Sequence, residues 1–312
     1  HFPIRENGKF VGYVNVVKQA GRKYIDKAGK EPCDIPEYLN EYLEKFTLPG
    51  QCIMDENGLS EAGYDVLKSM KKENVSYAEI RFAPLLSETA DMNCKKVIEA
   101  VLAGLEKGKK DFGIEYGVIT CAMRHHSQED NYRMIKTARE YLGEGVCAAD
   151  LAGAESLYPM SEFMELFRKT RKLGMPFTLH AGECGSVQNI LDSVEAGAGR
   201  IGHGIAMRGH ADIQKELQKK GIGIEMCPIS NLQTKAVEGT KDYPIREFLN
   251  AGLKVTVNTD NRTVSNTTLT KELEFIRKNY GITDEEIHLM MRNAVDVAFA
   301  DDAVKERMLK YV

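Results

Sequence analysis

Three short apolar stretches in the second half of the chain end in side chains that hydrolytic enzymes use. One stretch supplies His180 and Glu183, the next ends at His203, and a third ends at Asp260. A parallel barrel gathers the carboxyl ends of its strands at one face, so these side chains are predicted to share a site. Imidazole and carboxylate groups together can bind a metal and transfer protons, which is the chemistry of metal-assisted hydrolysis.

Each of these residues also has a simpler structural explanation. A lone histidine at the end of an apolar strand, such as His180, is commonly a hydrogen-bonded core residue. His203 lies between two glycines and could cap a tight turn, and Asp260 could be the N-cap of a helix. Three independent caps at neighbouring strand ends are a less economical explanation than one site. We therefore favour a shared catalytic site.

The elements that would position this site alternate between short apolar runs and longer amphipathic segments from residue 75 onward. The predicted strands are 75–82, 114–122, 146–151, 177–180, 200–202, 222–227 and 255–258. The predicted helices include 95–111, 128–141, 160–173, 187–196, 211–220 and 245–250. Nearly continuous apolar strands that alternate with helices are typical of a parallel sheet buried on both faces.

Local signals mark the ends of these elements. Several glycines fall just before predicted strands, where a helix commonly ends in a left-handed residue; they are Gly113, Gly145, Gly174, Gly221 and Gly252. Near the C-terminus, Thr283 and Glu286 have the spacing of a capping box ahead of a helix over residues 287–299.

A closed barrel of this type needs an eighth strand. The candidate is the alternating, β-branched segment 10–17, which could instead be an edge hairpin or part of a disordered leader. We therefore predict a (β/α)8 TIM-type barrel whose first strand is atypical or missing. The whole of 1–312 is predicted to form a single domain, with 1–38 as an atypical N-terminal segment.

Composition narrows the functional classes. Of the 312 residues, 43% are hydrophobic, which is ample for one large core. A net charge of −4 and a pI near 6.1 give no reason to expect a nucleic-acid partner, and no apolar run approaches the length of a membrane span. The seven cysteines are scattered without a C-x-x-C pair, which predicts reduced thiols in a cytoplasmic protein. Nothing in the sequence indicates the oligomeric state.

A series of short motifs runs through the chain in a fixed order. The motifs are Tyr77-Ala-Glu-Ile-Arg-Phe-Ala-Pro84, Asp150-Leu-Ala-Gly153, His180-Ala-Gly-Glu183, Gly202-His-Gly204, Cys227-Pro-Ile-Ser-Asn231 and Asn258-Thr-Asp260. In this order and spacing, from about residue 39 to near the C-terminus, the chain resembles the adenosine deaminase family of the metal-dependent amidohydrolase superfamily. Each motif alone is short, but the ordered series is highly specific.

The resemblance implies roles for the residues of the predicted site. His180 would be a zinc ligand, and Asp260 would be a carboxylate ligand that also orients the zinc-bound water. Glu183 would protonate purine N1 and so make C6 electrophilic. His203 would lie beside the attacking hydroxide and stabilise it or shuttle its proton. Zinc lowers the pKa of bound water to roughly 7, which makes this chemistry possible at neutral pH.

The resemblance also implies residues that bind the purine. Gly153 would offer its backbone N–H to purine N3, and Asp150 would support the loop that carries it. Asn261 stands where many relatives have a second Asp that contacts purine N7. An amide can donate a hydrogen bond to N7 without first being protonated, so this difference is compatible with purine binding.

The chain departs from the family at the first strand. Family members carry a His-x-His pair there that supplies two zinc ligands, but no histidine occurs between Phe2 and Arg124. The displayed chain could lack the native N-terminus, or it could be a relative that has lost zinc. A third explanation is a different metal arrangement that uses His1 or Asn15. The intact acid, His and Asp motifs favour the first explanation.

The expected reaction is therefore the hydrolytic deamination of adenosine, and of 2′-deoxyadenosine, to the inosine product and ammonia, with Zn²⁺ as cofactor and a purine nucleoside as partner. The alternative is a zinc-deficient, purine-nucleoside-binding pseudoenzyme. Other enzyme classes are disfavoured. The chain has neither the H-x-E and P-C-x-x-C motifs of cytidine-type deaminases nor a P-loop. A nucleophilic thiol at Cys184 would lack a visible oxyanion motif.

Overall fold

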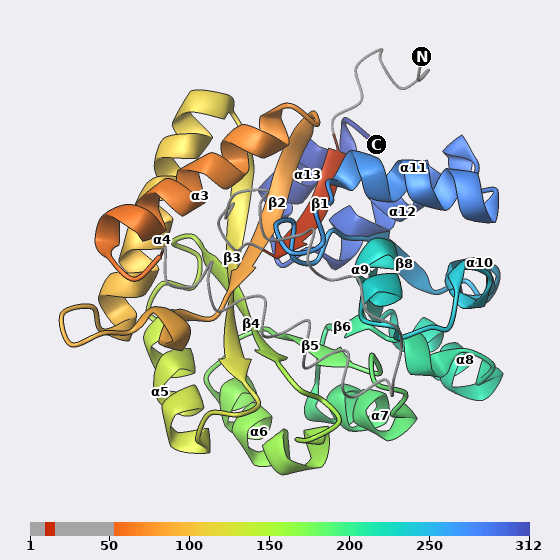
Figure 1. Cartoon of the computed structure of the whole chain (residues 1–312), viewed down its shortest axis with the longest axis horizontal. Helices are drawn as coiled ribbons and strands as arrows, with labels where there is room; N and C mark the ends of the chain where they lie inside the picture. The colour runs from red at the N-terminus through yellow and green to blue at the C-terminus, as the bar shows by residue number, and fades with distance from the viewer. Residues whose placement is uncertain (1–9, 16–52) are drawn as a thin grey trace.

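The computed structural model describes residues 10–15 and 53–312 (Figure 1). Strand β1 (Phe10–Asn15) lies within the segment predicted as the first barrel strand and pairs in parallel with β2 (Val75–Phe82). This confirms a first strand, whereas residues 16 and 17 and the rest of the atypical segment lie outside the described residues. At the carboxyl end of this pair, Asn15 is in register with Arg81.

The strands form a ring of parallel neighbours (Figure 1). After β2 they are β3 (Glu115–Met123), β4 (Val146–Ala152), β5 (Thr178–Ala181), β6 (Arg200–His203), β7 (Gly223–Met226) and β8 (Lys254–Val257). The ladder is continuous from β1 to β4 and from β5 to β8. A bridge between Ala149 and Phe177 joins the two halves, and β1 contacts β8 at the other junction. The TIM-type barrel is confirmed.

Helices surround the barrel (Figure 1). The α-helices are α3 (Glu56–Lys71), α4 (Cys94–Phe112), α5 (Gln128–Arg139), α6 (Met164–Lys172), α7 (Val187–Ala196), α8 (Ala211–Lys220), α9 (Pro228–Gln233), α10 (Ile245–Asn250), α11 (Leu269–Tyr280), α12 (Asp284–Val297) and α13 (Asp302–Leu309). Short 3₁₀ turns are η3 (Pro84–Ser87), η4 (Met160–Phe163), η5 (Ile205–Met207) and η6 (Thr240–Asp242). Within residues 53–312, no helix is long and apolar enough to cross a lipid bilayer.

The predicted end signals agree with the structure. All five glycines expected before strands have positive φ, between 66° and 108°. The capping box at Thr283 and Glu286 is present at the start of α12. The predicted helix over residues 160–173 is divided, because η4 precedes α6 and the chain changes geometry at Phe163. The assignment of residues 1–312 to a single domain remains a prediction.

Charged side chains occupy the interior of the barrel between the strands. Glu225 on β7 accepts hydrogen bonds from Arg81 (2.5 Å), from Arg200 (2.7 Å) and from Thr178 (2.9 Å). Arg200 also pairs with Glu79 at 2.6 Å. Burial raises the pKa of Glu225, but the two guanidinium groups outweigh it and lower that pKa to about 2. The interior is therefore held by ion pairs that are shielded from solvent, which makes each partner necessary to the others.

A second buried carboxyl, Glu272 on α11, predicts a pH-dependent stability. Its oxygens accept hydrogen bonds from Thr267 and from the backbone of Ile229, but burial dominates and raises its pKa from 4.5 to about 8. Between about pH 4.5 and 8 the folded state therefore holds a proton that the unfolded state has lost. The free energy of unfolding should fall as the pH rises through this window.

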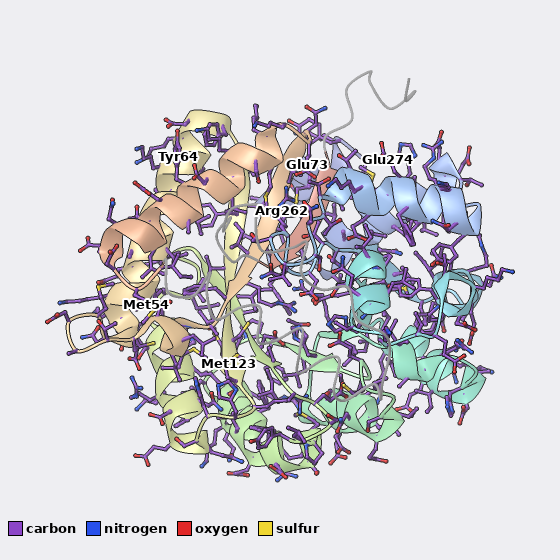
Figure 2. All side chains as sticks on the ribbon, in the orientation of Figure 1. Met54, Tyr64, Glu73, Met123, Arg262 and Glu274 are labelled. Atoms are coloured by element: carbon purple, nitrogen blue, oxygen red, sulfur yellow. The ribbon has the colours of Figure 1, made fainter. Side chains whose placement is uncertain are left out.

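Glu272→Gln should remove this loss, because the amide stays neutral. We expect the variant to match the wild type below pH 4.5 and to become more stable by roughly 5 kcal/mol above pH 8, because a pKa raised from 4.5 to about 8 costs about 1.4 kcal/mol for each pH unit of that window. Urea unfolding across this pH range measures the difference. Glu274→Gln, at an exposed position on the same helix (labelled in Figure 2), should leave the pH profile unchanged. A constant difference between the Glu272 variant and the wild type at every pH would contradict the prediction.

Candidate active site

His180 is held at the end of β5 by a neighbouring carboxylate. Its Nδ1 lies 2.8 Å from Oδ2 of Asp150 on β4, and its backbone N–H donates to Oδ1 of the same residue at 3.3 Å. Burial raises the pKa of Asp150, but Arg81 at 3.4 Å and His180 outweigh it, so the carboxyl is ionised. Because Nδ1 is turned to Asp150, Nε2 is the nitrogen that can meet a metal or a substrate.

Glu183 lies in a loop that another carboxylate fixes. Glu155, in the loop after β4, accepts hydrogen bonds from the backbone N–H groups of Gly182 (2.6 Å), Glu183 (2.9 Å) and Cys184 (3.2 Å). Gly182 has a φ of 75°, and a Cβ there would come within 2.5 Å of Ile190. A glycine is therefore required between His180 and Glu183, and it turns the acidic side chain back toward the barrel.

The carboxyl of Glu183 is almost fully buried. Thr234 donates a hydrogen bond to Oε1 at 3.1 Å, and Nε2 of His203 lies 3.5 Å from Oε2. Burial raises the pKa of Glu183, and the charge of Asp260 raises it further, against the opposing effect of His203. The raised pKa keeps the carboxyl protonated over a wider pH range, which suits a group that donates a proton.

His203 and Asp260 both adopt left-handed backbone conformations, with φ of 66° and 48°. The His203 ring lies 5.1 Å from the His180 ring, centroid to centroid, and its Nδ1 meets Asn231 at 2.9 Å. Ser230 donates to Oδ2 of Asp260 at 2.6 Å. Left-handed non-glycine residues are uncommon and collect at functional sites.

The structure brings these four predicted side chains together. The charge of Asp260 raises the pKa of both His180 and Glu183, and the charge of His180 acts on Glu183. His180, Glu183 and Asp260 therefore lie within electrostatic range of one another, and His203 contacts both Glu183 and His180. All four come from the carboxyl ends of β5, β6 and β8 or from the loops that follow them, as the barrel hypothesis requires.

The predicted purine-binding residues Gly153 and Asn261 follow the carboxyl ends of β4 and β8, which are not adjacent strands of the barrel. Gly153 follows β4 with a φ of 109° and is partly exposed. Asn261 is buried, and its Oδ1 accepts hydrogen bonds from the backbone of Thr263 (3.1 Å) and Val264 (2.7 Å). Its Nδ2 has no hydrogen-bond partner among the described residues. Figure 2 shows the next residue, Arg262, beside Glu73, and an ion pair joins the two.

Comparisons with known proteins show which proteins the chain is similar to. The family model described as adenosine deaminase matches residues 27–312. A protein of Clostridium botulinum (strain Okra / Type B1) named adenosine deaminase is 38% identical over 275 residues, which cover 88% of this chain and 82% of that protein.

The chain belongs to the adenosine deaminase family.

Two solved structures show the same fold. An N6-mAMP deaminase of Arabidopsis superposes with a TM-score of 0.84 at 22% identity and covers 97% of each chain. An amidohydrolase of Burkholderia ambifaria, described with bound Zn, superposes with a TM-score of 0.77 at 21% identity and covers 82% of this chain and 72% of that one.

Whether a family zinc site could form here depends on the number of donors. His180 and Asp260 are of the types that bind zinc, whereas a hydrolytic zinc site takes three protein ligands and a water. Among the described residues, no group of three or more His, Cys, Asp or Glu side chains is placed to hold a metal ion. The described part of this family member thus fits zinc in donor type but not in number.

Several residues that shape the site carried no role in the sequence-based hypothesis. They are Arg81, Glu155, Ser230, Asn231 and Thr234. A signal existed for Arg81, because a charged residue inside an apolar strand requires a buried partner. The side chain of Asp150 contacts His180 and Arg81, and its support of the Gly153 loop stays a prediction. No signal distinguished Thr234 from other threonines in loops.

Proposed function

We propose that this chain catalyses the hydrolytic deamination of adenosine, and of 2′-deoxyadenosine, to the inosine product and ammonia. Membership of the adenosine deaminase family supports the reaction class. The observation that carries the proposal is the environment of Glu183, a buried carboxyl with a raised pKa that lies between Thr234 and His203. A protonated carboxyl in this position is the acid that hydrolysis at a purine C6 needs.

In the proposed reaction, different residues of the site protonate the purine, hold the attacking water and bind the purine ring. Glu183 donates its proton to purine N1, which makes C6 more electrophilic. His203 and Asp260 hold the water that attacks C6 by hydrogen bonds. The backbone N–H of Gly153 binds purine N3, and the unpartnered Nδ2 of Asn261 donates to purine N7.

Zinc is part of the proposed reaction only if further ligands join His180 and Asp260 to complete its site. When bound, the metal would supply a water of lowered pKa, and His180 Nε2 and Asp260 would hold it together with ligands from outside the described residues.

The decisive experiment for the proposed function measures ammonia release from adenosine and elemental zinc in the same purified chain. Ammonia release supports the proposal, whereas a chain that carries zinc and leaves adenosine unchanged contradicts it.

Asp260→Ala should abolish zinc retention and reduce ammonia release to background, because the site loses one of only two described donors. Elemental analysis after dialysis against metal-free buffer measures the first effect. Asp212→Ala, an exposed position on α8, is the control and should retain the metal and activity of the wild type. Unchanged zinc in the Asp260 variant would refute its role as a ligand.

The zinc-deficient, purine-binding pseudoenzyme is the second candidate, and it is favoured by the lack of a third zinc donor among residues 10–15 and 53–312. This protein would bind adenosine through the same groups but release no ammonia, even after incubation with zinc. Calorimetric titration with adenosine, run beside the ammonia assay, separates the two functions. Binding without turnover supports the pseudoenzyme, and turnover excludes it.

A further inference from the structure

His203 is held by two side chains to which the proposed reaction gives no role. Nδ2 of Asn231, on α9, lies 2.9 Å from Nδ1 of His203. The hydroxyl of Tyr243 donates a hydrogen bond to Oδ1 of Asn231 at 3.4 Å. The three residues are at most 3% exposed. Bulk water therefore does not compete for these hydrogen bonds, and the side chains form a buried relay that ends at His203.

The chemistry of an amide determines where the His203 proton lies. An amide nitrogen carries protons and has no lone pair to accept a hydrogen bond, so Asn231 Nδ2 donates and His203 Nδ1 accepts. A neutral imidazole that accepts at Nδ1 carries its own proton on Nε2. The relay thus specifies one of the two tautomers.

Tyr243 determines which end of the amide faces His203. Burial raises the pKa of Tyr243 well above its ordinary value, so the hydroxyl keeps its proton at neutral pH. That hydroxyl donates to Oδ1, which leaves Nδ2 for His203. Turning the amide over would place its oxygen against the ring and its nitrogen against the hydroxyl.

The backbone fixes where Nε2 points. His203 has a φ of 66°, and the following Gly204 has a φ of 67° and donates its N–H to the carbonyl of Ala181 at 3.0 Å. A left-handed non-glycine residue costs on the order of 1–3 kcal/mol, so the surrounding structure must hold it in place. This turn directs Nε2 to within 3.5 Å of Oε2 of Glu183.

We propose that Asn231 and Tyr243 are positioning residues that hold His203 in its Nε2-protonated tautomer. His203 then presents a hydrogen-bond donor to the site, and its Nε2 has no lone pair with which to remove the proton of Glu183. The proton of Glu183 stays available for the purine ring. The tautomer follows from the described contacts alone, whereas its catalytic consequence rests on the proposed function.

Nitrogen NMR of the chain labelled with ¹⁵N-histidine tests the tautomer directly. Long-range proton–nitrogen correlations distinguish Nδ1–H from Nε2–H, and the chain has only seven histidines. A His203→Gln variant assigns the signals. We expect Nε2–H in the wild type. Observation of Nδ1–H in the wild type would overturn the proposal, whether or not the chain has deaminase activity.

Asn231→Asp replaces the donor with a carboxylate that accepts, so Nδ1 of His203 should become protonated. With adenosine as substrate, kcat should fall by a factor of about 10 to 100 while KM stays nearly constant, because a supporting group is reversed and the purine contacts remain. Asn250→Asp makes the same chemical change at an exposed position on α10 and should alter neither quantity.

Tyr243→Phe provides a second variant that removes only a hydroxyl. Without the hydroxyl the amide can turn, so NMR should show a mixture of the two tautomers and kcat should lie between those of the wild type and Asn231→Asp. An unchanged tautomer in both variants would overturn the proposal. If the tautomer changes but kcat does not, the relay has no catalytic consequence. If the wild type shows Nε2–H and no deamination, the proposed function fails and the tautomer assignment stands.

Discussion

Glu183→Gln should lower the rate of adenosine deamination by a factor of about 10² to 10⁴ and leave nucleoside binding largely intact. The amide fills nearly the same volume and can still accept the hydrogen bond from Thr234. It cannot deliver a proton to purine N1, because its N–H protons are not acidic. Steady-state kinetics should show the loss in kcat, and calorimetric titration with adenosine should show a Kd close to that of the wild type.

A control variant and an unfolding measurement show whether the loss of rate comes from the missing acid and not from a general effect of the substitution. Glu195→Gln, at an exposed position on α7, should have wild-type kinetics, since it makes the same change outside the site. The Glu183 variant should also unfold at a denaturant concentration no lower than that of the wild type, because it removes a buried ionisable carboxyl. If ammonia release is unchanged in the variant, Glu183 is not the acid.

Much of the fold could be predicted because the strands are nearly continuous apolar runs. Those runs locate β2 to β8 within one or two residues, and the alternation over residues 10–17 identifies β1. Helices α7, α8 and α10 begin and end at the predicted residues, because an adjacent glycine or a change in polarity marks their limits. The division of η4 from α6 could not be predicted, since both segments share one amphipathic pattern.

The candidate site was less predictable than the fold. Short motifs identified His180, Glu183, His203 and Asp260, but they carry no information about what lies around those side chains. Arg81 contacts Glu225 across 144 residues of sequence, and Asn231 reaches His203 across 28. Partners so far apart leave no spacing signal in a single sequence. Their roles became visible only when the barrel placed their strands and loops side by side.

A series of buried ion pairs connects Arg200, in the barrel interior, to the candidate active site. Arg200 is fully buried between Glu79 (2.6 Å) and Glu225 (2.7 Å), and its guanidinium carbon lies 4.0 Å from the centre of the Phe299 ring. Glu225 in turn binds Arg81, which meets the carboxylate of Asp150 that holds His180. A disturbance at Arg200 can therefore reach the metal-binding histidine of the proposed mechanism through contacts that are all buried.

Arg200→Met should lower the free energy of unfolding by about 3 to 5 kcal/mol, because two carboxylates lose a partner and cannot be reached by water. Urea unfolding measures the loss. Arg168→Met, on the exposed face of α6, should change the stability by less than about 0.5 kcal/mol, since its ion pair with Glu165 lies in solvent. Adding Glu79→Gln to Arg200→Met should recover part of the loss, because Glu79 pairs with Arg200 at 2.6 Å whereas Glu225 keeps its ion pair with Arg81. If the double variant were as unstable as the sum of both single variants, the ion pairs would not be the cause. The instability would then come from lost packing against Phe299.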